Sequence, residues 1–298
     1  MTMGHRRLGK AVVALFVIAA VGTGCSADSG QGGEDSKLSR TLSSLAAESV
    51  GEKSVTYLDM ARVRELAEDG GKRFSAVELP ASALITGYEA GPWGGQLKRD
   101  QIDTAVDSEV AGHWEGRFDA AAITGALKSN GYERKEEFWR DAEGSKPSLK
   151  VSDDEISYSH EGTDPMAAVH PDEGASLADE AEYRRAAECL GDVYRADFAG
   201  LRPDEPTRLS VLGQQASSAS ENTEILCAVV KDKATAERVA AELRSVVREE
   251  APRFDGTKVT VENGEQPYVR AVVPDKASQR PGRLATTDTQ LWMAANGA

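Results

Sequence analysis

The chain has 298 residues and a formal net charge of -14 at pH 7, so it repels nucleic-acid phosphates and anionic lipid surfaces. It also lacks a basic patch with interleaved aromatic residues, which excludes a typical nucleic-acid-binding protein. The hydrophobic content of 40% is enough for one domain of moderate size or two small ones.

Residues 1–25 have the order of regions that is typical of a secretory signal peptide. A short basic start is followed by the apolar run Ala11–Val21 and then by Gly22-Thr23-Gly24-Cys25. Basic, apolar and small residues in this order are typical of a segment that directs export. The apolar run, about 11 residues long, is too short for a bilayer core that needs roughly 20.

The small residues that run into Cys25 resemble the signal of bacterial lipoproteins. In that family the cysteine thiol receives a diacylglycerol and becomes the new N-terminus. The resemblance therefore implies a lipid on Cys25 and a location at the outer face of the cytoplasmic membrane. The sequence departs from the family's pattern at Gly22, where an aliphatic residue is usual. The alternative is an ordinary signal that is cut nearby and yields a free secreted protein.

Export would make the protein more acidic. The signal contains Arg6, Arg7 and Lys10 and no acidic residue, so the net charge of the mature chain falls by three to -17. Contact with the membrane is therefore expected from the lipid and not from the protein surface.

Two further cysteines, Cys189 and Cys227, remain once Cys25 is assigned to the lipid. An even pair of cysteines in an exported protein is expected to form a disulfide. The alternative is a catalytic thiol, but neither cysteine has a histidine nearby in the sequence or lies in a Cys-x-x-Cys motif. The sequence therefore favours a bond between Cys189 and Cys227.

Residues 26–53 are expected to form a flexible tether. The stretch 26–40 consists of Ser, Gly and charged residues with one Leu, so it buries too little apolar surface to offset its ordering entropy. A short helix is expected to begin within 42–47.

Residues 54–170 are predicted to form a first α+β unit. A strand at 54–58 precedes a helix capped by Asp59, and a strand at 111–117 precedes a helix capped by Asp119. Three further strands between 137 and 159 indicate an antiparallel meander.

Residues 171–298 are predicted to form a second α+β unit. A helix capped by Ser176 and ended by Gly191 opens it, and Asp232 caps a helix whose apolar residues recur at helical spacing over 236–247. The strands of this unit are expected at 209–212, 224–230, 257–261, 266–273 and 291–293.

The two units share an order of elements, and the segment 192–202 can be laid over 54–64. We therefore expect an α+β fold with two similar small α/β-sandwich-like units, each an antiparallel sheet with packed helices, that arose by internal duplication. Chance similarity of one short segment is the alternative.

Several longer sequence segments are similar to a group of actinobacterial, Streptomyces-type secreted envelope lipoproteins of unknown function. These segments are FDAAAITGALKSNGYE, LKVSDDEISYS, SLADEAEYRRAAECLGDV and LWMAANG. The resemblance covers most of the chain after the signal and implies a paired α+β fold at the cell surface. It supplies no catalytic residue.

No motif for catalysis, metal or phosphate binding is evident. The chain has no Gly-x-Ser-x-Gly elbow, no His-Glu-x-x-His or cysteine–histidine zinc spacing and no Walker motif, and its acidic stretch 153–164 lacks the order of an EF-hand. We therefore expect no metal and no cofactor. A triad assembled in space remains open, with His113, His160 or His170 as its base.

Trp93 is the aromatic residue for which we consider a binding role. It lies in the glycine-rich loop 91–95, from which an aromatic ring can stack on a sugar or a partner. The alternative is that Trp93 folds back and fills the core beneath the loop.

These observations favour a non-catalytic, membrane-anchored binding or scaffold module of the cell envelope, whose partner is an envelope protein or a ligand. One alternative is an envelope hydrolase with a spatially assembled active site, which requires a histidine in a cleft. The other is a carrier of a lipid or small apolar ligand, which requires a large apolar cavity.

Overall fold

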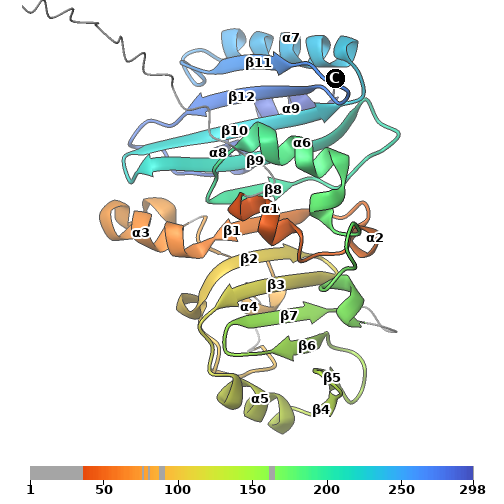
Figure 1. Cartoon of the computed structure of the whole chain (residues 1–298). Helices are drawn as coiled ribbons and strands as arrows, with labels where there is room; N and C mark the ends of the chain where they lie inside the picture. The colour runs from red at the N-terminus through yellow and green to blue at the C-terminus, as the bar shows by residue number, and fades with distance from the viewer. Residues whose placement is uncertain (1–35, 76, 80, 87–90, 161–164, 298) are drawn as a thin grey trace, which may run out of the picture.

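The structure, a computed structural model, describes residues 36–75, 77–79, 81–86, 91–160 and 165–297. Its centre is one antiparallel sheet of 12 strands that runs the length of the molecule (Figure 1). The strands lie side by side in the order β11 (Lys258–Glu262), β12 (Tyr268–Pro274), β10 (Glu221–Val230), β9 (Thr207–Ser218), β8 (Arg195–Phe198), β1 (Val55–Asp59), β2 (Ile102–Ser108), β3 (Ala111–Gly116), β7 (Glu155–Ser159), β6 (Ser148–Val151), β5 (Phe138–Asp141) and β4 (Tyr132–Lys135).

The pairing of β1 with β8 joins the two halves of the chain. Val55 lies opposite Phe198 and Tyr57 opposite Ala196, so the strands from both halves form one ladder. The mixed α+β class with antiparallel strands is confirmed. In place of one sheet in each expected unit, a single sheet runs through both.

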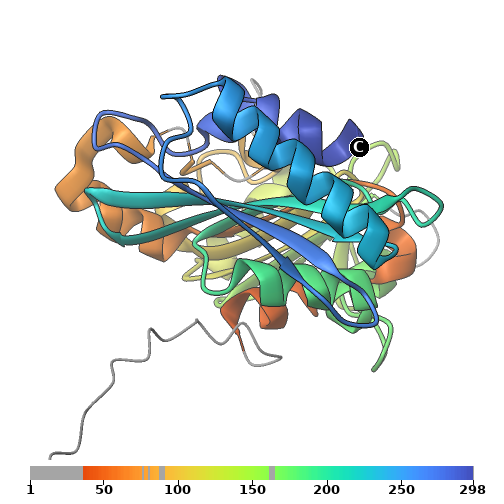
Figure 2. The ribbon, with the colours of Figure 1, turned by 90° about the horizontal axis from the view of Figure 1, so that it is seen from above.

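Helices cover both faces of the sheet (Figure 2). We name the face covered by α1 (Lys37–Leu42), α2 (Ala47–Val50) and α6 (Ala181–Leu190) face A. The opposite face, face B, carries α3 (Met60–Gly70), α4 (Ala83–Thr86), α5 (Ala120–Ser129), α7 (Lys233–Glu249), α8 (Arg283–Thr286) and α9 (Gln290–Gly297).

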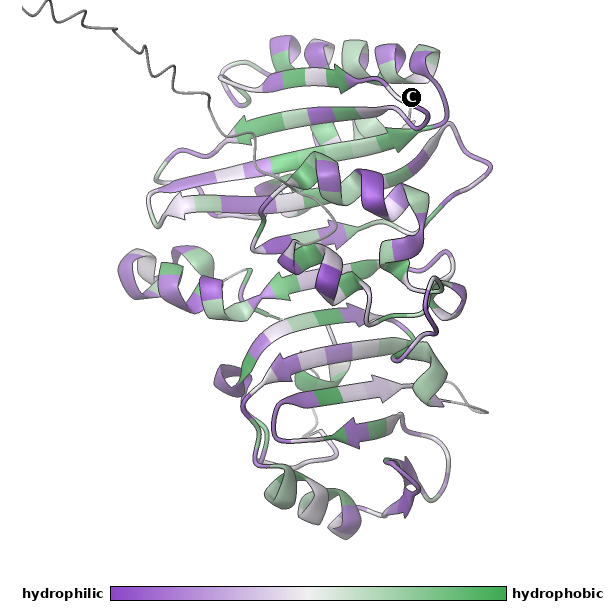
Figure 3. Cartoon of the chain, viewed as in Figure 1, coloured by the Kyte–Doolittle hydropathy of each residue, from purple (hydrophilic) through white to green (hydrophobic). Residues whose placement is uncertain are grey.

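The alternation of side chains along the strands produces these two layers. In β1, Val55 and Tyr57 point into the apolar cluster on face A, and Leu58 points into a cluster on face B. In β10, residues Ile225–Val230 are buried on both faces, so this strand reads as a continuous apolar run. Figure 3 shows that run as a hydrophobic stretch in the middle of the upper half.

The best-marked helices form where their caps predict. Asp119 caps α5 by accepting from the backbone N–H of Ala122, and Asp232 caps α7 by accepting from that of Thr235. The strand expected at 291–293 is wrong, because these residues lie within α9. Leu291 and Ala295 are buried one helical turn apart, and a three-residue apolar stretch does not distinguish this spacing from a strand.

Part of the segment expected to be a tether is folded. Residues 36–53 form α1 and α2, and Leu38, Leu42 and Leu45 are buried in the cluster on face A. Ser36 caps α1 by accepting from the backbone N–H of Ser39. The low apolar content of 26–40 hid this packing, since the buried leucines lie at its end and beyond.

The disulfide between Cys189 and Cys227 is confirmed. It ties α6 to β10 and lies within the apolar cluster on face A. The predicted signal peptide and Cys25 lie outside the described residues. Among the helices that the structure describes, none is long and apolar enough to cross a membrane.

Candidate functional site

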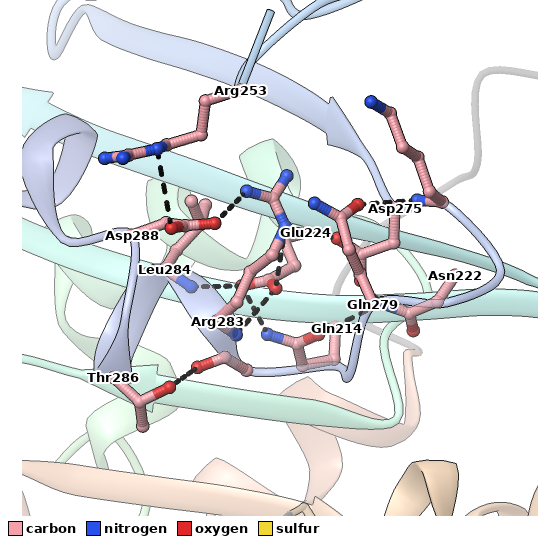
Figure 4. A network of polar contacts seen from close by, with 12 residues as sticks. Gln214, Asn222, Glu224, Arg253, Asp275, Gln279, Arg283, Leu284, Thr286 and Asp288 are labelled. Atoms are coloured by element: carbon pink, nitrogen blue, oxygen red, sulfur yellow. Dashed lines mark hydrogen bonds and ion pairs between the residues drawn. The ribbon is translucent and has the colours of Figure 1, made fainter. Parts of the chain in front are cut away.

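A buried network of polar side chains lies on face B, where β10 passes under the C-terminal segment 275–288 (Figure 4). Its centre is Glu224, whose side chain is 0% exposed. A buried carboxylate is costly unless its oxygens accept hydrogen bonds. Here Oε1 accepts from the backbone N–H of Arg283 at 2.8 Å, and Oε2 accepts from that of Leu284 at 3.1 Å and from Nε2 of Gln214 at 3.1 Å.

Arg283 connects this carboxylate to two others. Its guanidinium group is 5% exposed and donates from Nε to Asp275 at 2.7 Å and from Nη1 to Asp288 at 2.6 Å. It also lies over the ring of Phe254, with 5.6 Å between Cζ and the ring centroid. The backbone and the side chain of this one residue therefore hold the C-terminal segment against the sheet.

Asn222 extends the network toward the middle of the molecule. Its Nδ2 donates to Asp275 at 2.6 Å and to Gln214 at 3.3 Å, and its Oδ1 accepts from the hydroxyl of Tyr194 at 2.7 Å. Each member thus has a partner from another strand or loop, which fixes the shape of the surface above it.

The electrostatics of the network reflect its burial. Burial, together with the nearby Asp275 carboxyl group, raises the pKa of Glu224 to about 7. Burial also raises the pKa of Asp275 above its ordinary value. Glu224 and Asp275, which share Arg283, therefore keep their protons to a higher pH than exposed carboxyl groups do.

Two clefts flank the network. Cleft 1 has a volume of about 630 Å³ and lies between the start of α3 and the end of the β9–β10 hairpin. Its charged lining consists of four acidic residues and one basic residue, namely Asp59, Asp192, Glu221, Asp275 and Arg62. The cleft is therefore acidic, and Arg62 is already paired with Glu65 at 2.9 Å.

Cleft 2 has a volume of about 440 Å³ and lies on face B above β8. Its floor is the ion pair of Arg195 and Asp197, and its walls are Val77 and the segment 279–288. Arg195 donates from Nε and from Nη2 to the two oxygens of Asp197, each at 2.7 Å. Asp275 lines cleft 1 and Arg283 lines cleft 2, so the network is their shared wall.

The structure places Trp93 in the core. Its side chain is 3% exposed and packs edge-to-face on Trp114, with 5.7 Å between ring centroids. The ring therefore fills the core under its loop, and it offers no exposed surface on which a sugar could stack.

His113 has the hydroxyl partner that a hydrolase requires, but in the wrong arrangement. Its Nδ1 lies 3.0 Å from Oγ of Ser157, and that hydroxyl donates to Glu155 at 2.7 Å. In a catalytic triad the histidine lies between the hydroxyl and the carboxylate, whereas here the Ser157 hydroxyl lies between His113 and Glu155. On the other side of the ring, Nε2 of His113 lies 3.9 Å from Oε1 of Glu115, which is longer than a hydrogen bond. Ser157 is also 0% exposed, so no substrate can reach it.

The other two histidines do not complete a site. Nε2 of His170 lies 3.4 Å from Oε1 of Glu155, and the ring of His160 contacts Tyr158 edge-on at 6.3 Å. Burial lowers the pKa of both histidines. Neither cleft is lined by a histidine, and the described residues contain no group of three or more side chains that could hold a metal ion.

The sequence contains one signal for the buried network. Gln214 and Glu224 are polar residues next to the mostly apolar stretch 209–213 and the apolar stretch 225–230. A charged residue at the edge of such a run reads as the exposed end of the strand. Only its contact with Arg283, 59 positions along the chain, gives it a buried partner.

No family model matches the chain, and no curated protein or solved structure is significantly similar to it. Its function therefore has to be argued from the site itself.

The raised pKa of Glu224 predicts how stability depends on pH. The folded protein binds this proton with a pKa of about 7, against an ordinary value of 4.5, so the group's contribution to the free energy of unfolding falls as pH rises across that window. Between pH 5 and 7.5, the free energy of unfolding of wild type should fall by about 2 kcal/mol relative to that of Glu224→Gln. Urea denaturation at several pH values measures this difference.

The matched control is Glu242→Gln, which removes an exposed carboxylate from α7. Its stability should follow that of wild type across the same pH range. Profiles of wild type and Glu224→Gln that run parallel would show that Glu224 is not titrating in this window.

Proposed function

We propose that the protein is a membrane-anchored extracytoplasmic lipoprotein that serves as a non-catalytic binding module of the cell envelope. The observation that carries the binding role is the pair of clefts on either side of one hydrogen-bonded wall. Preformed clefts of a few hundred Å³ beside fixed polar groups are typical of ligand sites. The anchoring role is supported by the basic, apolar and small residues that lead to Cys25.

The position of α1 favours a particular orientation of the anchored protein. α1 packs on face A, whereas cleft 2 opens on face B. A lipid on Cys25 joined to α1 by a Ser- and Gly-rich spacer, 26–35, would hold the body within about 20 Å of the membrane. Face A would then be turned to the membrane, and cleft 2 would be open to the envelope.

The two alternatives receive less support. A hydrolase would need an accessible nucleophile, and the Ser157 hydroxyl beside His113 is buried. A lipid carrier would need a large apolar chamber. In the part of the chain that the structure describes, apolar clusters fill the space between sheet and helices, and charged residues line both clefts.

We also propose that the two halves arose by duplication. The two halves share a common set of elements, three strands, a helix and a hairpin whose last strand pairs with the third: β1, β2, β3, α5, β6, β7 and β8, β9, β10, α7, β11, β12. The first half also contains α3 and α4 between β1 and β2, and the hairpin β4–β5 between α5 and β6. The shared set of elements supports the proposal better than the similarity of 54–64 to 192–202. That alignment equates Tyr57 with Arg195, and these side chains lie on opposite faces of the sheet.

The anchor is tested by Cys25→Ala. The variant should leave the membrane fraction and appear in the soluble extracytoplasmic fraction, because a single cysteine carries the proposed lipid. Fractionation of cells and mass spectrometry of the N-terminal peptide measure both effects. Unchanged membrane retention, with no lipid on the wild-type peptide, would refute the anchor.

The binding role is tested by photo-crosslinking in intact cells. A benzoylphenylalanine at Thr287 in cleft 2 or at Ser220 in cleft 1 should give discrete crosslinked products. The same residue at Glu242, on the exposed side of α7, is the control and should give none of these products. Identical products from all three positions, or none from either cleft, would contradict the binding of a macromolecular partner at the clefts.

A further inference from the structure

Cleft 2 contains one cation that no other described residue neutralises. Five charged residues line it, namely Arg195, Asp197, Arg280, Arg283 and Asp288. Two of the arginines are committed to acidic partners, Arg195 to Asp197 and Arg283 to Asp288 and Asp275. Arg280 is exposed and makes no hydrogen bond or ion pair with the described part of the chain.

The backbone on both sides of Arg280 is held in place. On one side, the carbonyl oxygen of Gln279 accepts from Nε of Arg73 at 3.0 Å, and its side chain accepts from the backbone N–H of Lys276 at 2.7 Å. On the other side, Pro281 is buried and Arg283 is fixed by the network. Arg280 therefore presents an unused guanidinium group from a fixed position at the cleft.

The charge of the cleft differs in sign from that of the protein. Three arginines and two aspartates give its lining a formal charge of +1, whereas the whole chain carries -14. A guanidinium group forms paired hydrogen bonds with carboxylate and phosphate oxygens. Of the two clefts, cleft 2 therefore repels an anion less, since cleft 1 is lined by four acidic residues and one basic residue.

The remaining lining suggests what else the ligand contains. Val77 is buried beneath the cleft and Ala285 lies at its rim, so part of the wall is apolar. Thr287 is exposed and its hydroxyl has no hydrogen-bond partner among the described residues, which leaves a second donor in the lining of the same cleft. The volume of about 440 Å³ suits a small molecule rather than a peptide segment.

We propose that cleft 2 binds a small organic oxyanion, a carboxylate or a phosphate ester with a short apolar tail. Arg280 and the Thr287 hydroxyl hold the oxyanion, and the tail lies against Val77 and Ala285. The proposal rests on the proposed binding function and gives it a ligand class. The ion pair of Arg195 and Asp197 stays closed beneath the ligand and forms the floor.

The test uses the exported protein with three probes of one tail length: hexanoate, hexyl phosphate and hexanol. Titration is followed by amide shifts in NMR spectra, and the amides of 279–288 should move with either anion and not with hexanol. Arg280→Gln should weaken anion binding about tenfold or more, as expected for a lost charge-assisted pair. Arg280→Lys should retain part of the affinity.

The matched control is Arg238→Gln, which removes an exposed arginine from α7 and should leave binding unchanged. Since Arg280 is exposed and has no partner to lose among the described residues, Arg280→Gln should unfold at the wild-type temperature. The anion that binds more tightly identifies which oxyanion the cleft prefers.

Equal affinity in wild type and Arg280→Gln, shifts that map elsewhere, or no binding of either anion would overturn the ligand class. Those outcomes would not by themselves overturn the binding function, because crosslinking from either cleft is scored separately. If anions bind at Arg280 but neither cleft gives crosslinks, cleft 2 is a small-molecule site without a macromolecular partner.

Discussion

The clamp between Glu224 and Arg283 is the interaction on which the surface of this protein depends. A fully buried carboxylate is tolerated only if its oxygens are satisfied, and the backbone N–H groups of Arg283 and Leu284 provide two of the three hydrogen bonds that do so. The same contact holds the C-terminal segment on face B. Without the contact between Glu224 and Arg283, cleft 2 would lose one wall. Asp275, at the border of cleft 1, would lose its ion pair with Arg283. Removing one partner from such a pair leaves the other buried and unpaired, which is why the network should behave as a unit.

The continuous sheet places cleft 2, which the clamp borders, at the junction of the two halves of the chain. Because β1 pairs with β8, residues from both halves meet around cleft 2: Val77 comes from the first half, and Arg195 and 279–288 come from the second. A cleft at this junction needs both halves folded. The disulfide between Cys189 and Cys227 strengthens the opposite face by joining α6 to β10. One face is therefore braced covalently and the other by buried charge.

Local features were readable from the sequence, and the long-range ones were not. The caps at Asp119 and Asp232 and the pairing of two cysteines depend on neighbouring residues or on the compartment, so they could be predicted. The joining of the halves depends on contacts such as Val55 with Phe198, which no local pattern encodes. The sequence does not decide whether Trp93 is an exposed binding residue or a core residue, since its burial depends on Trp114 in a distant strand. Glu224 has the sequence pattern of an exposed strand end, and only its distant partner Arg283 accounts for its burial.

The buried carboxylate of Glu224 in β10 caps the short helix α8. Amide hydrogen exchange measured by NMR tests this cap directly, because N–H groups in the first turn of a helix are ordinarily unprotected. The amides of Arg283 and Leu284 should exchange as slowly as the ladder amides of β10. The neighbouring amide of Ala285, whose bond to Gly282 is 3.3 Å long on an exposed turn, should exchange faster. Exchange of Arg283 and Leu284 as fast as Ala285 would contradict the clamp and, with it, a fixed wall for the two clefts.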